Sequence, residues 1–201
     1  REIEGSLRRL GVERIDLYQM HWPAGDGTPL EAYWQELLDL KQEGKVRAVG
    51  LSNHNLAQLQ DAEALGHVES LQPPFSAIQR GAANDLIPWC AQNGTGVIVY
   101  SPMQSGLLSG GFSVERAQAL PADDWRSRNA EFQAPNLARN LALAEALKPI
   151  AERHGTTQAA VAIAWTLAWP GVTGAIVGMR NTAQVDGVLG AAELELDGDD
   201  M

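Results

Sequence analysis

The fold is indicated most clearly by the stretch Val97-Ile98-Val99-Tyr100-Ser101-Pro102, an apolar run that ends in polar and turn-forming residues. A continuous apolar run of strand length is typical of a strand buried on both faces, as in a parallel sheet. Four other runs have this character, and each is followed by a helical pattern. They lie at residues 15–20, 46–51, 70–72 and 174–177. The sequence therefore predicts an α/β fold of about five parallel strand–helix units.

These five units fill 201 residues, which is roughly 40 residues each, so a closed eight-unit barrel needs on the order of 320. No GxGxxG pattern follows the first predicted strand, which counts against a doubly wound dinucleotide-binding fold. We therefore expect a partial (β/α)8 (TIM) barrel. The chain begins at Arg1 within a helical pattern and stops before a further helix, so we expect a fragment truncated at both ends.

The sequence also predicts one helix start, one long loop and two later helices. Thr28, Pro29 and Glu31 form the pattern of a capping box with a proline at the first helical position. The polar segment 103–135 has no clear periodicity, and we expect a long loop there, which is usually functional or mobile. Two helices are predicted after it, at residues 137–153 and 158–168.

The composition excludes several classes of protein. Hydrophobic residues make up 45% and charged residues 20% of the chain, which is enough apolar material for a core. The net charge of −10 argues against binding to nucleic acid, which requires a basic surface. No apolar run approaches the length of a membrane span, no signal peptide opens the chain, and the single cysteine, Cys90, excludes an intramolecular disulfide. We expect a cytoplasmic globular protein with no membrane contact.

Polar residues follow each predicted strand, where parallel barrels place their functional groups. The five strand ends read His21-Trp22-Pro23, Ser52-Asn53-His54, Gln72-Pro73-Pro74, Tyr100-Ser101-Pro102 and Gly178-Met179-Arg180-Asn181. They contain no carboxylate pair for glycoside hydrolysis and no acidic third ligand that would complete a metal site with the histidines, so we predict no metal. Carboxamides and a hydroxyl facing an aromatic ring suit a flat amide such as nicotinamide, and an arginine suits a phosphate.

Four stretches, in order on successive predicted strands, resemble the aldo-keto reductases, a family of NADP-dependent oxidoreductases. They are residues 6–11 with 15–23, 49–53, 100–102 with 105–108, and 176–180 with Gln184. The resemblance covers nearly the whole chain, from roughly the fourth to the eighth barrel strand of the family. It implies hydride transfer from NADPH to the carbonyl of an aldehyde or ketone, with NADP(H) as cofactor and a small carbonyl compound as substrate.

The resemblance also assigns roles to individual residues. His21 matches the catalytic histidine that orients the substrate carbonyl. Three residues match those that hydrogen-bond the nicotinamide carboxamide: Ser52, Asn53 and Gln72. Tyr100 matches the aromatic residue that stacks on the nicotinamide. The segment Ser101, Pro102, Met103, Gln104 and Ser105 matches the residues that follow the pyrophosphate, and the residues Gly178, Arg180 and Gln184 match the adenosine 2′-phosphate end.

The chain departs from the family at the proton donor. The family's Tyr, Lys and Asp stand on the first three barrel strands, and the tyrosines of this chain, Tyr18, Tyr33 and Tyr100, offer no Tyr–Lys pair. We therefore predict that the fragment itself is inactive. Gly187 and Val188 replace the Glu and Asn that are common near the adenine.

Alternative interpretations concern both the whole chain and single residues. The chain could be a non-catalytic NADP-binding or interaction module on the same fold. Ser52-Asn53 could simply cap a helix, and Arg180 could be an ordinary solvated residue. We expect His54 either at the surface or behind the site residues.

Overall fold

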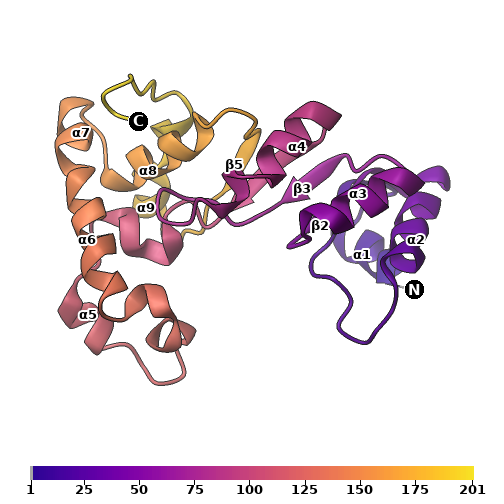
Figure 1. Cartoon of the computed structure of the whole chain (residues 1–201), viewed down its shortest axis with the longest axis horizontal. Coiled ribbons are helices and arrows are strands. Elements are labelled where there is room, and N and C mark those ends of the chain that lie inside the picture. Colours follow the sequence, from indigo (N-terminus) through magenta and orange to yellow (C-terminus); the bar gives the residue numbers. More distant parts are fainter. Residues whose placement is uncertain (1) are drawn as a thin grey trace. The chain divides into compact units, whose positions relative to one another are not determined.

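The computed structural model describes residues 2–201, which divide into two compact units (Figure 1). Unit 1 comprises the residues up to Pro73 together with Gly81–Val99. Unit 2 comprises Pro74–Arg80 and Tyr100–Met201. The predicted site residues therefore fall into two sets, which belong to different units.

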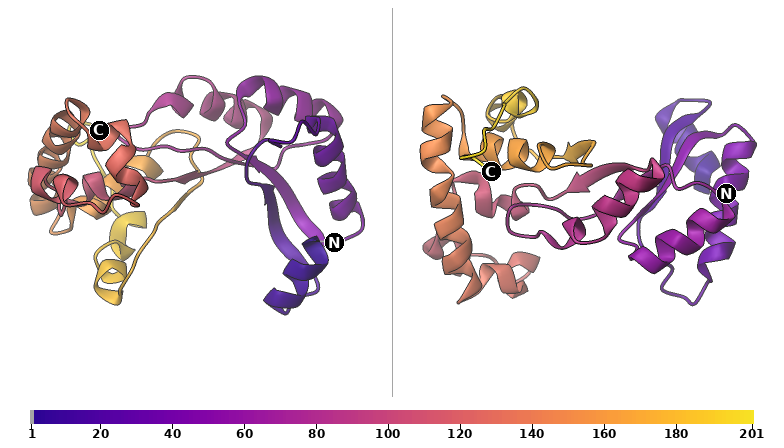
Figure 2. Two further views of the ribbon diagram at one scale, coloured as in Figure 1. Left: turned by 90° about the horizontal axis from the view of Figure 1, so that it is seen from below. Right: turned by 45° about the horizontal axis from the view of Figure 1, so that its top comes forward.

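Unit 1 alternates helices and strands along the chain, as the sequence predicts. In order, its elements are α1 (Glu2–Leu10), β1 (Ile15–Met20), α2 (Leu30–Gln42), β2 (Val46–Ser52), α3 (Leu56–Leu65), β3 (Ser70–Gln72), the 3-10 helix η1 (Gly81–Ala83), α4 (Leu86–Asn93) and β4 (Gly96–Tyr100). Strands β1 to β4 pair in parallel with their neighbours in chain order, and β1 and β2 run side by side over their length (Figure 2). This arrangement brings their carboxyl ends together, with Ser52 beside Gln72.

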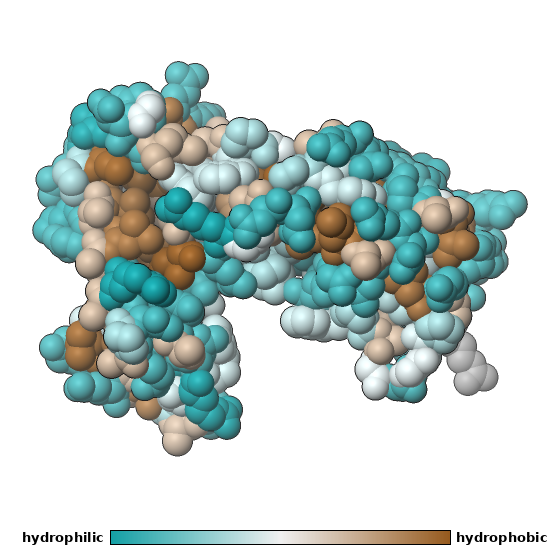
Figure 3. Space-filling model, in the orientation of Figure 1, coloured by the Kyte–Doolittle hydropathy of each residue, from teal (hydrophilic) through white to brown (hydrophobic). Residues whose placement is uncertain are grey.

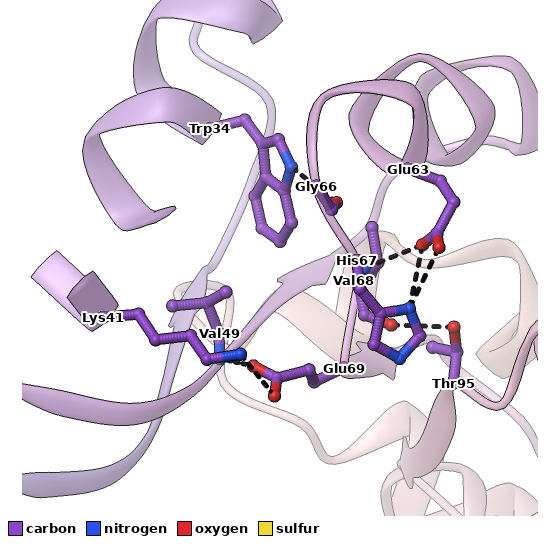
Figure 4. Close-up of polar contacts among 9 residues, drawn as sticks. All are labelled: Trp34, Lys41, Val49, Glu63, Gly66, His67, Val68, Glu69 and Thr95. Carbon is purple, nitrogen blue, oxygen red and sulfur yellow. Dashed lines mark hydrogen bonds and ion pairs between the residues drawn. The ribbon is translucent and has the colours of Figure 1, made fainter. Parts of the chain in front are cut away.

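The core of unit 1 explains why these strands are continuous apolar runs. Val46, Val49 and Leu51 of β2 are all buried, so this strand has little polar face. Helix α2 buries Trp34 completely, and the indole Nε1 donates a hydrogen bond to the carbonyl oxygen of Gly66 (3.2 Å; Figure 4). Burial of this face holds α2 on the sheet.

The predicted capping box at the start of α2 is wrong. The residue before the helix is Pro29, in an extended conformation and without a side-chain cap. The Thr28 N–H, which a capping box would pair with Glu31, donates to the carboxylate of Asp26 (2.9 Å) instead. A capping box does form one helix later, between Asn55 and Gln58 at the start of α3. Since Asn55 caps α3, the interpretation of Ser52-Asn53 as helix caps is also wrong.

A group of polar contacts surrounds the start of β3 (Figure 4). One oxygen of Glu69 accepts the backbone N–H of Val49 (2.9 Å), and the other pairs with Nζ of Lys41 (2.7 Å). The hydroxyl of Thr95 donates to the carbonyl oxygen of Val68 (2.7 Å). These bonds satisfy backbone groups that the sheet leaves unpaired.

Replacing Glu69 with alanine is expected to reduce the free energy of unfolding by about 1–3 kcal/mol, because the Val49 N–H loses its acceptor. Replacing Lys41 with methionine removes only a half-exposed ion pair and is expected to cost less than about 1 kcal/mol. Urea unfolding of the two variants measures the difference. Equal losses would contradict the importance of the Val49 contact.

Unit 2 is mostly helical. Its elements are the 3-10 helices η2 (Gln104–Ser109), η3 (Trp125–Arg128), η4 (Ala130–Phe132) and η5 (Leu189–Ala192), the helices α5 (Val114–Gln118), α6 (Asn136–Ala146), α7 (Lys148–Arg153), α8 (Gln158–Leu167) and α9 (Thr182–Asp186), and strand β5 (Gly174–Ile176). The single helix predicted at 137–153 is in fact α6 and α7. Pro149 lies in the first turn of α7, where its missing N–H is tolerated, so a new helix begins there.

The segment 103–135 is more ordered than the predicted long loop. It contains η2, α5, η3 and η4, all short. Leu107, Phe112 and Phe132 are buried in one apolar cluster with Leu137 of α6. The two phenylalanine rings meet edge to face, with centroids 5.3 Å apart. A few irregularly spaced apolar residues thus anchor the segment, and such anchors leave no periodic pattern in the sequence.

Candidate functional site

In unit 1 the structure brings together the four predicted site residues at the carboxyl ends of β1, β2 and β3. The Nδ2 atom of Asn53 donates to the carbonyl oxygen of His21 (2.9 Å) and to the hydroxyl oxygen of Ser52 (3.1 Å). The Ser52 hydroxyl in turn donates to the carbonyl oxygen of Gln72 (2.8 Å). These residues come from the ends of three strands that are distant in sequence, and their hydrogen bonds form one continuous network.

The backbone at Asn53 is in the left-handed region, with φ of 61°. This conformation is unfavourable for most residues, but asparagine tolerates it better than others. It ends β2 abruptly and allows the Asn53 side chain to reach back to His21. Strained non-glycine residues are concentrated at functional sites, so this turn marks the network as a candidate site.

The network includes a residue that sequence reasoning missed. The Nε2 atom of Gln72 donates to Oε1 of Gln19 (2.8 Å), and Nε2 of Gln19 donates to the hydroxyl of Ser70 (3.1 Å). The sequence did offer a signal for Gln19, because it is an amide within the run 15–20, which is predicted as a buried strand. A partly buried amide also needs partners, and here strand β3, which lies on the far side of β2 from β1, supplies them.

His54 lies behind the network and is not at the surface. It is 2% exposed, its Nδ1 lies 2.8 Å from the carbonyl oxygen of Ser52, and its Nε2 lies 2.8 Å from the hydroxyl of Tyr33. A carbonyl can only accept, so Nδ1 carries the proton and Nε2 accepts from Tyr33. Burial lowers the pKa of His54 below its usual value near 6.5 and raises the pKa of Tyr33.

This lowered pKa predicts a dependence of stability on pH. Below about pH 6.5 the unfolded chain protonates His54 more readily than the folded chain does, so His54 lowers stability as the pH falls. Replacing His54 with phenylalanine is expected to reduce the loss of stability between about pH 7 and 5. Urea unfolding of wild type and variant at both pH values measures this loss of stability. An unchanged pH dependence in the variant would contradict the lowered pKa of His54.

In unit 2 most of the remaining predicted residues line one cavity of about 850 Å³. They are Tyr100, Ser101, Pro102, Met103, Ser105, Gly178, Arg180 and Gln184. Figure 3 shows an apolar surface on this unit around α8 and α9. Gln104 is the exception, since it does not line the cavity and its Oε1 accepts a hydrogen bond from the hydroxyl of Ser76 (3.0 Å).

The segment 101–105, which lines the cavity except at Gln104, has an unusual backbone. Ser101, Gln104 and Ser105 all have positive φ, between 44° and 58°. Such a concentration of strained residues is typical of segments that clamp a ligand. The segment therefore has the geometry of a binding loop.

Arg180 stands at the cavity on a short turn before α9. The backbone N–H of Arg180 donates to Oε1 of Gln184 (2.7 Å), and Asn181 caps the helix by accepting from the Gln184 N–H (3.0 Å). Gln184 thus stabilises the turn that presents the exposed Arg180. Two further arginines line the cavity: Arg116 and Arg126.

Those two arginines have internal partners. Arg126 forms an ion pair with Asp124 (2.6 Å), which lowers the pKa of the Asp124 carboxyl to about 2. Arg116 donates to the carbonyl oxygen of Gly111 (2.6 Å). Within residues 2–201, no three His, Cys, Asp or Glu side chains are grouped as a metal site, and no helix is long and apolar enough to cross a membrane.

Comparison with known proteins decides the family. The model of the Aldo/keto reductase family matches residues 1–201. The chain belongs to the aldo/keto reductase family. Among curated relatives of this aldo/keto reductase chain, "Aldo-keto reductase YhdN" of Bacillus subtilis (strain 168) is 31% identical over 186 residues, which is 92% of this chain and 55% of the relative. The "NADH-specific methylglyoxal reductase" of Escherichia coli (strain K12) is 30% identical over 197 residues, which is 97% of this chain and 59% of that protein.

A solved structure confirms the fold. The glycerol dehydrogenase AKR11B4 from Gluconobacter oxydans is 35% identical and superposes with a TM-score of 0.90, over 99% of this chain and 60% of that one. The predicted partial barrel of parallel strand–helix units is therefore confirmed. This aldo/keto reductase chain spans a little more than half the length of the relatives it matches.

The lysines of this aldo/keto reductase chain are all engaged in ion pairs. Lys41 pairs with Glu69, Lys45 with Glu4 and Glu43, and Lys148 with Glu145. The Tyr33 hydroxyl, for its part, is bonded to His54.

Proposed function

We propose that this chain is the cofactor-binding part of an oxidoreductase that transfers a hydride from NADPH to the carbonyl carbon of a small aldehyde or ketone. The observation that carries the proposal is the single network that links His21, Asn53, Ser52 and Gln72. These residues lie at the strand ends where barrel enzymes have their active sites.

The network fits the carboxamide of a nicotinamide ring. A carboxamide both donates and accepts hydrogen bonds, and Ser52, Asn53 and Gln72 offer groups of both kinds. Holding the carboxamide would fix which face of the ring meets the substrate, and the bound cofactor would supply the hydride. His21 would orient the carbonyl oxygen, beside the exposed ring of Trp22, whose centroid lies 5.8 Å from that of His21.

The residues that line the cavity of unit 2 suit the phosphate groups of such a cofactor. The strained segment 101–105 would follow the pyrophosphate, and Tyr100 would stack on the nicotinamide. The guanidinium of Arg180 would pair with the 2′-phosphate, which favours NADPH over NADH. Because one relative is named NADH-specific, the choice of cofactor needs a direct comparison.

We further propose that this chain alone binds cofactor without turnover. The alkoxide formed by hydride transfer needs a proton, and a tyrosine is a more effective donor at neutral pH when a nearby cation lowers its pKa. Here burial raises the pKa of both Tyr33 and Tyr100, and the lysines pair with glutamates.

The test is a titration of the chain with NADPH and with NADH, followed by an assay of NADPH oxidation with a simple aryl aldehyde. The same assay is applied to a chimera in which the residues preceding the matched part of YhdN are joined ahead of Arg1. We expect both proteins to bind NADPH and only the chimera to reduce the aldehyde. Turnover by the chain alone would contradict the proposal that it lacks a general acid. If neither protein binds NADPH, a non-catalytic interaction module is favoured.

A further inference from the structure

The half-buried Tyr33 and the buried His54 form a polar pair that the proposed roles do not use. Tyr33 belongs to α2, and His54 follows β2, 21 residues later. Their rings meet edge to face with centroids 5.8 Å apart, and the hydroxyl lies 2.8 Å from Nε2. His54 is almost fully buried, so its two ring nitrogens need partners within the protein.

The two partners of His54 define one arrangement of protons. The Ser52 carbonyl accepts from Nδ1–H, so Nε2 has no proton and accepts from the tyrosine hydroxyl. The tyrosine thereby selects the tautomer in which Nδ1 is the donor. The direction of the whole chain of bonds, from Tyr33 through His54 to Ser52, is fixed.

This chain of bonds ends at the Ser52–Asn53 turn, which belongs to the network proposed to hold the nicotinamide carboxamide. The Ser52 carbonyl precedes Asn53, whose φ of 61° is strained and must be held by its surroundings. The Asn53 side chain then contacts the carbonyl oxygen of His21 and the hydroxyl of Ser52. If Nδ1–H is lost, the Ser52 carbonyl loses its donor and the turn can relax away from this geometry.

We propose that Tyr33 and His54 are positioning residues, which hold the Ser52–Asn53 turn in the conformation that binds the nicotinamide carboxamide. The inference rests on the proposed function, since it assigns these residues to the nicotinamide end of the cofactor. Neither residue touches the cofactor in this scheme. They act through the backbone carbonyl of Ser52.

Two substitutions of His54 separate its two contacts. In His54→Asn, the side-chain amide can occupy the position of Nδ1 and still donate to Ser52. In His54→Gln, the longer amide reaches the position of Nε2 and Tyr33, and the donor to Ser52 is lost. We expect His54→Asn to bind NADPH within about threefold of wild type, and His54→Gln to bind it about tenfold more weakly, the usual effect of one lost hydrogen bond.

The readout compares two ligands, NADPH and adenosine 2′,5′-bisphosphate, by calorimetric titration. The bisphosphate carries the adenosine 2′-phosphate but no nicotinamide, so its affinity is expected to be equal in both variants and wild type. A general loss of folding would instead weaken both ligands. His67→Gln is the matched control, because His67 is an exposed histidine of the same unit that pairs with Glu63, and it is expected to change neither affinity.

Tyr33→Phe provides a second, conservative variant. It is expected to weaken NADPH binding and, in two-bond 1H–15N spectra, to reduce the population of the Nδ1-protonated tautomer of His54. Wild-type NADPH affinity in both His54→Gln and Tyr33→Phe would overturn the inference and leave the proposed function standing. Failure of the wild-type chain to bind NADPH at all would overturn the proposed function, and the inference with it.

Discussion

Replacing Arg180 with methionine is expected to weaken the binding of NADPH by about 100-fold and to leave the binding of NADH within about twofold. The guanidinium of Arg180 is exposed at the unit 2 cavity, on a turn held by Gln184 and Asn181. A charge-assisted, bidentate contact between arginine and phosphate contributes about 3 kcal/mol, which corresponds to a loss of about 100-fold in affinity. NADH has no 2′-phosphate, so it loses nothing when the arginine is removed.

Calorimetric titration of both cofactors measures this effect. Arg128→Met is the matched control, since Arg128 is an exposed arginine of the same unit that does not line the cavity. Its removal changes the net charge equally and is expected to alter NADPH affinity by less than about twofold at physiological salt. Equal losses for NADPH and NADH in Arg180→Met would contradict recognition of the 2′-phosphate.

Replacing Trp34 with alanine is expected to reduce the free energy of unfolding by about 3–5 kcal/mol. Trp34 is 0% exposed, and truncation leaves a large cavity in the core of unit 1. The Gly66 carbonyl also loses the hydrogen bond from the indole Nε1. A loss of this size is a large part of the stability of an ordinary domain.

Urea unfolding followed by far-ultraviolet circular dichroism tests this expectation. Trp34→Phe retains most of the buried volume and is expected to lose less than alanine does. Trp22→Ala is the control, because Trp22 is 56% exposed and its removal is expected to change stability by less than about 0.5 kcal/mol. Equal losses in Trp34→Ala and Trp22→Ala would show that the indole of Trp34 is not part of the core.

The order of strands and helices followed directly from the sequence. Runs such as Val97–Tyr100 are continuously apolar because both faces of a parallel strand are buried, and this leaves a clear signal. Helix ends were less predictable. The Thr28 and Asn55 regions both contain capping residues, but only Asn55 forms a capping box, and the Thr28 N–H bonds to Asp26.

Some features of the candidate site could likewise be predicted from the sequence, and others could not. The positions of His21, Ser52, Asn53 and Gln72 at strand ends could be predicted, because parallel pairing brings those ends to one edge. The partner of Gln104 could not be predicted, because Ser76, which donates to the Gln104 side chain, lies 28 residues away in the sequence. Nor could the burial of His54, whose partner Tyr33 lies on α2, 21 residues earlier in the sequence.

The α/β architecture, the family and the strand ends where polar residues collect could all be predicted from the amino-acid sequence. These properties depend on local periodicity and on the order of motifs along the chain. The pairing of polar groups, such as the bond between Gln19 and Gln72, and the left-handed turn at Asn53 became known only from the folded chain. The reason is physical: a buried polar group must find a partner, and that partner is set by the elements packed against it rather than by its neighbours in sequence.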